Sequence, residues 1–378
     1  MSEASMTEEP PFDQLGTLLP GDCIVRRPGT FQRFDFHVGT VTVPALLWCR
    51  PEQTGRLLIA FNGAVRRTPE KDPQEIFQRR TWVDDIEADI LFLSDPTLRS
   101  DNRISIGWGQ GTQGRYANPA MAQTARFTAE CLDIPAGARL YFGTSAGGFQ
   151  ALQAAARDEG SRALVNNPQI DWTKYMPTFV DTIAGYSYED QPTEDIAIDH
   201  PDRTSVAHAF AAFGHIPRTR CLINAASKND SLAQLPALVA ALPAQSGERS
   251  CFDVSLYSDV RGGHNPLPRP ATTTAINSIL RKPSMSDTIE TDATFPALSP
   301  DPESIVAGVS AAARALATMP TTSGWPRAGS ASSSRTSRPR RRSAEFSSIS
   351  PLLRARRCGH ASSPTISPLT VTPVWHVC

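Results

Sequence analysis

Residues 143–147 read Gly-Thr-Ser-Ala-Gly, a Gly-x-Ser-x-Gly pattern centred on Ser145. A short apolar run precedes the pattern at residues 139–142, and a stretch rich in Ala, Gln and Leu follows it at residues 148–156. This order of strand, tight turn and helix is typical of a nucleophile elbow, in which the turn exposes the serine hydroxyl. The pattern therefore predicts acyl chemistry at the hydroxyl oxygen of Ser145.

A serine hydroxyl is a weak nucleophile at neutral pH, so it needs a nearby base and a carboxylate that orients the base. Downstream of an elbow serine, the acid comes first in the chain and the histidine second. His264 follows the last expected strand in a loop with two preceding glycines, and we expect it to be the base. The other downstream histidines lie in an interrupting segment or near the end of the chain: His200, His208, His215, His360 and His376.

Asp230 is our first choice for the carboxylate, because it comes shortly after the penultimate expected strand. An Asx turn or a helix cap is the alternative role for this residue. Asp171 follows the preceding strand and is the second candidate. Asp259 lies only five residues before His264 on the same loop, where its geometry is poor for this role.

Acyl transfer also needs hydrogen-bond donors for the developing oxyanion. One donor is the backbone N–H of the residue after the nucleophile, here Ala146. The second comes from the loop after an early strand, where this chain has Asn62-Gly63-Ala64. We expect the N–H of Gly63 or Ala64 to serve, although an ordinary strand-ending turn explains the same residues.

The elements that must position these residues follow an alternating pattern. Early alternation at residues 33–38 and 41–47 indicates an antiparallel start. Later apolar runs are continuous, as in buried parallel strands, and helical patterns lie between several of them. The expected buried strands are residues 56–61, 88–93, 139–142, 162–165, 221–225 and 252–257, and the expected helices are residues 118–131, 148–156 and 271–280. The sequence therefore predicts an α/β fold with a doubly wound, mostly parallel sheet.

The chain divides by composition. Residues 1–19 are expected to be disordered, residues 20–283 to form one α/β domain, residues 284–320 to be a linker with a possible helix, and residues 321–378 to be a disordered tail rich in Ser, Arg and Pro. Within the domain, residues 172–218 interrupt the alternation. We expect a helical insertion there, either a lid over the carboxyl edge of the sheet or a purely structural excursion.

Charge separates the tail from the rest of the chain. Residues 321–378 contain nine Arg and one acid, which leaves a formal net charge of −9 on residues 1–320. An acidic body argues against nucleic acid as its main partner. A basic tail could bind nucleic acid or acidic membranes, but a disordered appendage without a dedicated role is the simpler interpretation.

No metal or cofactor is expected. The seven cysteines form no C-x-x-C pair, so reduced thiols are expected rather than zinc or disulfides. The phosphate-binding motifs G-x-G-x-x-G and G-x-x-x-x-G-K-[ST] do not occur at the elbow. The start of the chain has no basic and apolar leader, and no apolar run reaches membrane-spanning length. We therefore expect a cytoplasmic protein, with its oligomeric state left open.

The arrangement resembles the α/β-hydrolase superfamily over residues 20–283. The resemblance is carried by Asn62-Gly63-Ala64, the pattern around Ser145, Asp230 and His264. It implies the α/β-hydrolase fold and ester chemistry by a serine hydrolase, through an acyl-enzyme and without a cofactor. Short phrases are also similar to hydrolase-like proteins encoded near bacterial surface-glycan genes: residues 61–64, 94–97, 106–108 and 167–169.

The narrower likeness implies an acylated glycan as the substrate, and a small ester is the alternative. Two alternatives to a hydrolase stay open. An acyltransferase would use the same residues and differ only in the acceptor that resolves the acyl-enzyme. A non-catalytic accessory protein of surface-glycan assembly would keep the fold without the reaction, although such a protein has no need for Ser145, Asp230 and His264 together.

Overall fold

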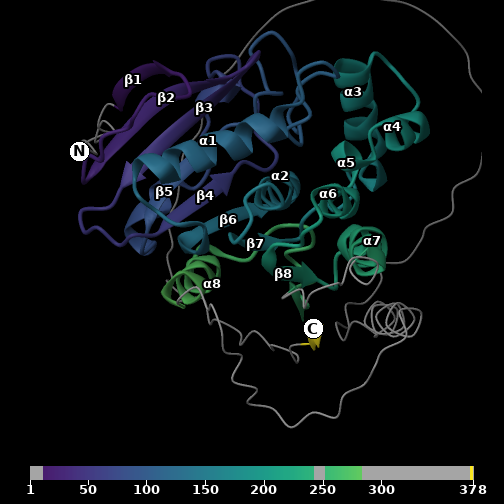
Figure 1. Ribbon diagram of the computed structural model, residues 1–378. Helices are drawn as coiled ribbons and strands as arrows, with labels where there is room; N and C mark the ends of the chain where they lie inside the picture. The colour runs from purple at the N-terminus through teal and green to yellow at the C-terminus, as the bar shows by residue number, and fades with distance from the viewer. Residues whose placement is uncertain (1–11, 242–251, 283–374, 378) are drawn as a thin grey trace, which may run out of the picture. The chain divides into compact units, whose positions relative to one another are not determined.

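One ten-stranded sheet organises the computed structural model, which describes residues 12–241, 252–282 and 375–377 (Figure 1). The strand order is β1-β2-β3-β5-β4-β6-β7-β8-β9-β10. The strands are β1 (Asp13–Leu18), β2 (Thr30–Val38), β3 (Val41–Cys49), β4 (Leu57–Phe61), β5 (Asp89–Leu93), β6 (Arg139–Thr144), β7 (Arg162–Asn166), β8 (Arg218–Asn224), β9 (Phe252–Tyr257) and β10 (Trp375–Val377).

The helices lie between these strands. They are α1 (Ala117–Cys131), α2 (Ala146–Ala155), α3 (Pro177–Tyr188), α4 (Thr193–Asp199), α5 (Pro201–Thr204), α6 (Val206–Phe213), α7 (Leu235–Ala241) and α8 (Arg269–Arg281). Short turns of other helix types are η1 (Pro73–Glu75), η2 (Arg80–Asp85), η3 (Ala136–Ala138), η4 (Trp172–Lys174) and the π-helix η5 (Asp230–Gln234).

The sheet is parallel from β5 through β9, and antiparallel pairing joins β2 to β3 and β3 to β5. The chain runs outward to β5 and then returns past β4 to β6, so the sheet is wound in both directions. This confirms the predicted fold class, a doubly wound, mostly parallel α/β sheet of the α/β-hydrolase type. It also puts β6, the strand that leads to Ser145, in the interior of the sheet.

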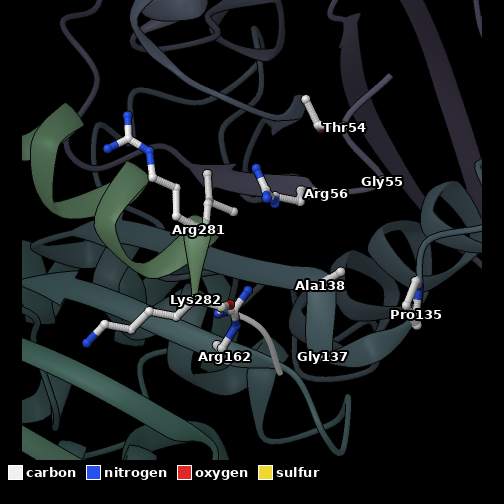
Figure 2. Close-up of a pocket in the computed structure, with 10 residues that line it drawn as sticks. Thr54, Gly55, Arg56, Pro135, Gly137, Ala138, Arg162, Arg281 and Lys282 are labelled. Atoms are coloured by element: carbon white, nitrogen blue, oxygen red, sulfur yellow. The ribbon is translucent and has the colours of Figure 1, made fainter. Parts of the chain in front are cut away.

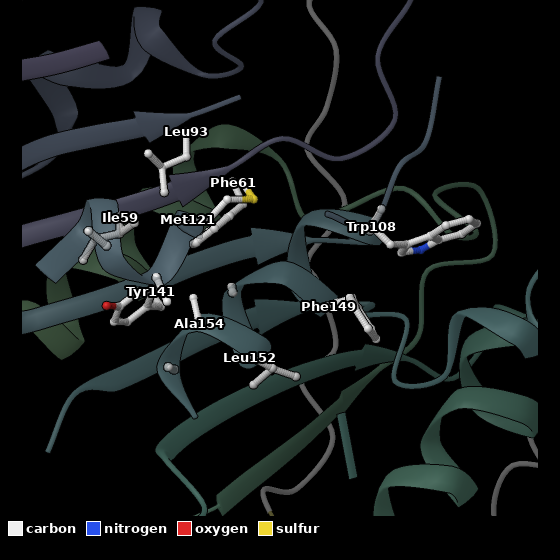
Figure 3. Close-up of a cluster of buried hydrophobic side chains, with 14 of the residues drawn as sticks. Ile59, Phe61, Leu93, Trp108, Met121, Tyr141, Phe149, Leu152 and Ala154 are labelled. Carbon is white, nitrogen blue, oxygen red and sulfur yellow. The ribbon is translucent and has the colours of Figure 1, made fainter. Parts of the chain in front are cut away.

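Apolar side chains fill the space on both faces of the sheet. On one face, side chains of α1 and α2 such as Met121 and Phe149 pack against strand residues such as Ile59 and Tyr141 (Figure 3). On the other face, α8 contributes Ile276 and Leu280 to a smaller cluster. Because both faces are covered, the central strands are buried along their whole length, which explains their continuous apolar sequences.

Glycines allow α2 to pack directly on the ends of the central strands. A Cβ added at Gly143 would lie 2.0 Å from the carbonyl oxygen of Gly147. A Cβ added at Gly147 would lie 2.8 Å from the carbonyl oxygen of Phe61. The first turn of α2 is therefore in backbone contact with both β6 and the end of β4.

At each end of the chain, the structure has a short strand within a segment that the sequence predicts to be disordered. The segment expected to be disordered over residues 1–19 contains β1, which pairs in parallel with β2. Its mixed polar sequence lacks a strand signal, and the pairing edge of β2 supplies the order. The segment expected to be disordered over residues 321–378 contains β10, which pairs with β9. Residues 1–11, the linker at residues 284–320 and the tail before β10 lie outside the described residues.

Residues 172–218 hold η4 and the four helices α3 to α6. Among the described residues, no helix has both the length and the apolar character needed to cross a membrane. A lid function for this helical segment remains a prediction.

The close packing of α2 makes Gly143 sensitive to added volume. Gly143→Ala forces a methyl group against the Gly147 backbone, so we expect the free energy of unfolding to fall by about 1–3 kcal/mol. Urea denaturation followed by circular dichroism measures this change. Gly114→Ala is the control, because a Cβ there meets no atom within 4 Å. An equal effect of the two substitutions would contradict the packing argument.

Candidate active site

Ser145 sits between β6 and α2 in a strained backbone conformation. Its φ is 55° and its ψ is −125°, which for a non-glycine residue costs about 1–3 kcal/mol. Hydrogen bonds hold it there. The Ser145 N–H donates to the carbonyl of Asn166 at 3.2 Å, and the Ser145 carbonyl accepts from the N–H groups of Phe149 and Gln169, each at 3.2 Å. Strain maintained in this way is typical of a functional position.

A chain of hydrogen bonds links Ser145, His264 and Asp230. The Oγ of Ser145 lies 2.8 Å from Nε2 of His264. Nδ1 of His264 lies 2.9 Å from both carboxylate oxygens of Asp230. An ionised carboxylate can only accept hydrogen bonds. Nδ1 of the ring therefore carries a hydrogen and donates a hydrogen bond to Asp230. In the neutral ring Nε2 is then an acceptor for the hydroxyl of Ser145.

The burial of the three groups is graded. The side chain of Asp230 is fully buried, whereas that of His264 is 31% exposed. A buried carboxylate is costly unless it is paired, and His264 supplies the partner. The imidazole therefore stands between a buried charge and the outside of the site.

The other two candidate carboxylates are engaged elsewhere. Asp171 caps η4 by accepting from the N–H of Thr173, and it forms an ion pair with Lys174 at 3.2 Å. Asp259 accepts from backbone N–H groups in its own loop, including that of Gly262 at 2.9 Å. Of the three acids considered from the sequence, Asp230 is the one that hydrogen-bonds with His264.

Asp230 begins the π-helix η5, a helix type that is frequent at functional sites. The side chain of Gln234 links this turn to the segment that follows β7. Its Oε1 accepts hydrogen bonds from the N–H groups of Ile170 at 2.7 Å and Asp171 at 3.0 Å. These bonds fix the position of the turn that carries the carboxylate. Asp230 was predicted from its place after a strand, but the π-helix has no signal in the sequence.

Three asparagines at the carboxyl ends of β7 and β8 hold the loop of His264. Asn167 donates to the carbonyl of His264 at 3.2 Å, and Asn224 donates to the carbonyls of Asp259 and Gly263, each at 2.7 Å. Asn166 accepts from the N–H of Leu267 at 2.7 Å. We call Asn166, Asn167 and Asn224 the asparagine clamp. The sequence did not reveal its role, although all three residues lie at or just after the carboxyl ends of predicted strands, on the edge where His264 was expected.

Gln169 contacts the hydroxyl of Ser145 directly, and its orientation is fixed by Trp108. The indole N–H of Trp108 can only donate, and it lies 2.6 Å from Oε1 of Gln169. The amide nitrogen of Gln169 must therefore face Ser145, where it donates to Oγ at 2.9 Å. With this donor in place, the hydroxyl of Ser145 is directed toward His264. In the sequence, residues 167–169 were noticed only as part of a family resemblance.

The two expected oxyanion donors lie in adjoining backbone segments. Ala146 is the first residue of α2, so its N–H has no acceptor within the helix. On the facing turn, the N–H of Gly63 donates to Oε1 of Gln78 at 2.9 Å, and Gln78 in turn donates to the carbonyl of Ala64 at 2.7 Å. Gly63 is thus already engaged. The N–H of Ala64 has no acceptor in the described part of the chain.

Aromatic side chains form a wall beside the imidazole. The ring of Tyr175 lies 5.7 Å from that of His264 and 6.0 Å from that of Trp108. Trp108 stacks on Trp172 at 5.6 Å. Burial raises the pKa of the Tyr175 hydroxyl, so this side chain remains a neutral phenol. It therefore contributes a covering surface and no charge to the histidine.

A separate cavity of about 380 Å³ lies at the opposite edge of the sheet (Figure 2). Arg56, Ala138 and Arg162, at the amino ends of β4, β6 and β7, belong to its lining. None of the residues around Ser145 lines it. This cavity is therefore distinct from the candidate active site.

Comparison with known proteins finds similarity in structure alone. No protein-family model and no curated protein matches the sequence. Similar solved structures include the capsule O-acetyltransferase of Neisseria meningitidis serogroup A, with 14% identity over 66% of this chain and 94% of that chain and a TM-score of 0.48. Porphyromonas gingivalis dipeptidyl peptidase 4 has 14% identity over 67% of this chain and 35% of its own, with a TM-score of 0.49.

Prolyl oligopeptidase B from Galerina marginata has 12% identity over 66% of this chain and 36% of its own, with a TM-score of 0.45. All three proteins have α/β-hydrolase-like folds. At TM-scores below 0.5, the similarity carries no argument about chemistry. The function of this chain must therefore be inferred from its own residues.

The asparagine clamp predicts a local effect on the His264 loop. Asn224→Ala removes two donated hydrogen bonds and leaves two partly buried carbonyls without these partners, so we expect the free energy of unfolding to fall by about 1–3 kcal/mol. We also expect faster amide exchange in residues 259–265, measured by hydrogen exchange and mass spectrometry. Asn265→Ala, an exposed change in the same loop, is the control. Unchanged exchange in Asn224→Ala would show that the clamp does not hold the loop.

Proposed function

We propose that this protein is a serine hydrolase of the α/β-hydrolase superfamily that cleaves an ester through an acyl-enzyme. The observation that carries the proposal is the hydrogen-bond chain from Ser145 through His264 to the buried carboxylate of Asp230. The strained backbone of Ser145 supports it, because an elbow of this kind presents a nucleophile. The proposal assigns nucleophile, base and orienting acid to these three residues.

In the first half of the reaction, Oγ of Ser145 attacks the ester carbonyl carbon while Nε2 of His264 takes the hydroxyl proton. Asp230 stabilises the imidazolium that forms and keeps its orientation. The negative carbonyl oxygen is accommodated by the N–H groups of Ala146 and Ala64. The bond to the leaving alcohol then breaks, and His264 returns the proton to the alcohol oxygen.

In the second half, water attacks the acyl carbon and gives a proton to His264. The bond to Ser145 breaks, Ser145 regains its proton, and a carboxylic acid leaves.

An acyltransferase is the second candidate, in which an acceptor hydroxyl takes the place of water. The packing of Tyr175 against His264 favours it, because a covered imidazole is less accessible to bulk water.

A fluorophosphonate probe tests whether the protein reacts at all. We expect it to label the wild-type protein at Ser145, identified by peptide mass spectrometry. Ser145→Ala and His264→Ala should abolish labelling and turnover of an activated ester, with unchanged circular dichroism. A wild-type protein that stays inert toward the probe would instead favour a non-catalytic accessory role. Added alcohol acceptors that yield new esters would favour transfer over hydrolysis.

The assignment of the acid has its own test. Asp230→Asn removes the charge that stabilises the imidazolium, and kcat should fall roughly 10⁴-fold, as at other carboxylates in this role. Asp171→Asn is the matched control, since Asp171 pairs with Lys174, and kcat should change less than about threefold. Steady-state hydrolysis of a 4-nitrophenyl ester measures both. A reversed order of the two effects would assign the acid to Asp171.

A further inference from the structure

A charged side chain that has no acidic partner in the described part of the chain lies next to the nucleophile. Nη2 of Arg79 donates to Oγ1 of Thr144 at 2.7 Å, and Thr144 directly precedes Ser145. Nη1 of Arg79 lies 3.5 Å from Oε1 of Gln78, the same oxygen that accepts from the N–H of Gly63. The guanidinium therefore touches both the strand that carries the nucleophile and the side chain that braces the oxyanion turn.

Arg79 is held firmly in this place. Its backbone is left-handed, with φ 66° and ψ 12°. Its guanidinium carbon lies 5.5 Å from the ring centroid of Trp82 and 5.4 Å from that of Phe142. Two aromatic contacts of this kind restrain the side chain and leave the edge of its N–H fork for other partners.

The charge of Arg79 is not neutralised within the described residues, where no carboxylate forms an ion pair with it. Some other poorly exposed arginines do have such partners, namely Arg26 with Asp89, Arg33 with Glu75 and Arg139 with Asp158, whereas Arg157 and Arg162 bond to carbonyl oxygens. Burial lowers the pKa of Arg79 to about 10, so the group still carries its charge at neutral pH. Removing a charge from water without a partner costs free energy, which an anionic ligand would offset.

The order of the sheet shows which part of an ester would reach this charge. Arg79 lies in the segment between β4 and β5, on the β4 side of β6. His264 follows β9, on the opposite side of β6. The leaving alcohol must lie beside His264, because Nε2 returns the proton to it. The acyl half of the ester then extends away from His264, toward Arg79.

We propose that Arg79 binds a carboxylate at the far end of the acyl group, so that the preferred substrate is a monoester of a dicarboxylic acid. The planar guanidinium fork matches a carboxylate in two parallel hydrogen bonds. This inference rests on the proposed hydrolase function and narrows its substrate. It makes Arg79 a residue that determines specificity for the acyl group, separate from the reacting atoms.

Two activated esters of equal chain length test the inference on the full-length protein. These are 4-nitrophenyl monoadipate, which ends in a carboxylate, and 4-nitrophenyl hexanoate, which ends in a methyl group. We expect the wild-type kcat/KM to favour the monoadipate. Arg79→Met should lower kcat/KM for the monoadipate roughly 10–100-fold more than it lowers kcat/KM for the hexanoate, the range for a lost charge-assisted contact. Arg79→Lys should retain part of the preference.

Arg66→Met is the control, because Arg66 is an exposed arginine two residues beyond Ala64 and carries the same charge. It should leave the preference for the monoadipate within about twofold. If the Arg79 variants fail to fold, the wild-type protein still gives a test. Raising the salt concentration should reduce turnover of the monoadipate more than that of the hexanoate.

The outcomes separate this inference from the proposed function. Labelling of Ser145 by the fluorophosphonate probe with equal turnover of the two esters would overturn the carboxylate subsite and leave the hydrolase intact. An equal loss of preference in Arg66→Met would overturn the specific role of Arg79. Absence of labelling in the wild-type protein would overturn the hydrolase itself.

Discussion

The backbone of Ser145 is held in a conformation that an isolated chain would avoid, and the surrounding structure is arranged to hold it. Asn166 at the end of β7 and the first turn of α2 each bond to its main chain. That turn can approach only because Gly143 and Gly147 lack side chains. The strain is thus balanced by packing of the central strands, and any change that loosens α2 acts on the hydroxyl of Ser145.

Polar side chains concentrate at the carboxyl edge of the parallel strands, where the backbone hydrogen bonds between neighbouring strands end. The residues of the asparagine clamp lie at the ends of β7 and β8, and their side chains hydrogen-bond with backbone groups of the His264 loop. Gln169 bonds to Trp108 on one side and to Ser145 on the other. The positions of the hydroxyl and the imidazole therefore follow from hydrogen bonds made by residues that end adjacent strands.

The sequence was sufficient to locate strands that are buried along their whole length. The strands β4 to β7 have apolar runs because both sheet faces are covered, and the sequence located each of them within a few residues. It could not separate Asp230 from Asp171, since both follow strands at the same edge. Which carboxylate meets His264 depends on the π-helix η5 and on the bonds of Gln234, and neither leaves a periodic signal.

The charged groups on the two sides of Ser145 create an electrostatic field across the site. The buried carboxylate of Asp230 lies behind His264, and the guanidinium of Arg79 lies on the opposite side of β6. The N-terminus of α2 adds partial positive charge at Ala146. A field with this sign favours movement of the hydroxyl proton toward His264 and of negative charge toward Ala146 and Ala64. Since no carboxylate among the described residues forms an ion pair with Arg79, its charge contributes to this field whether or not a carboxylate is bound.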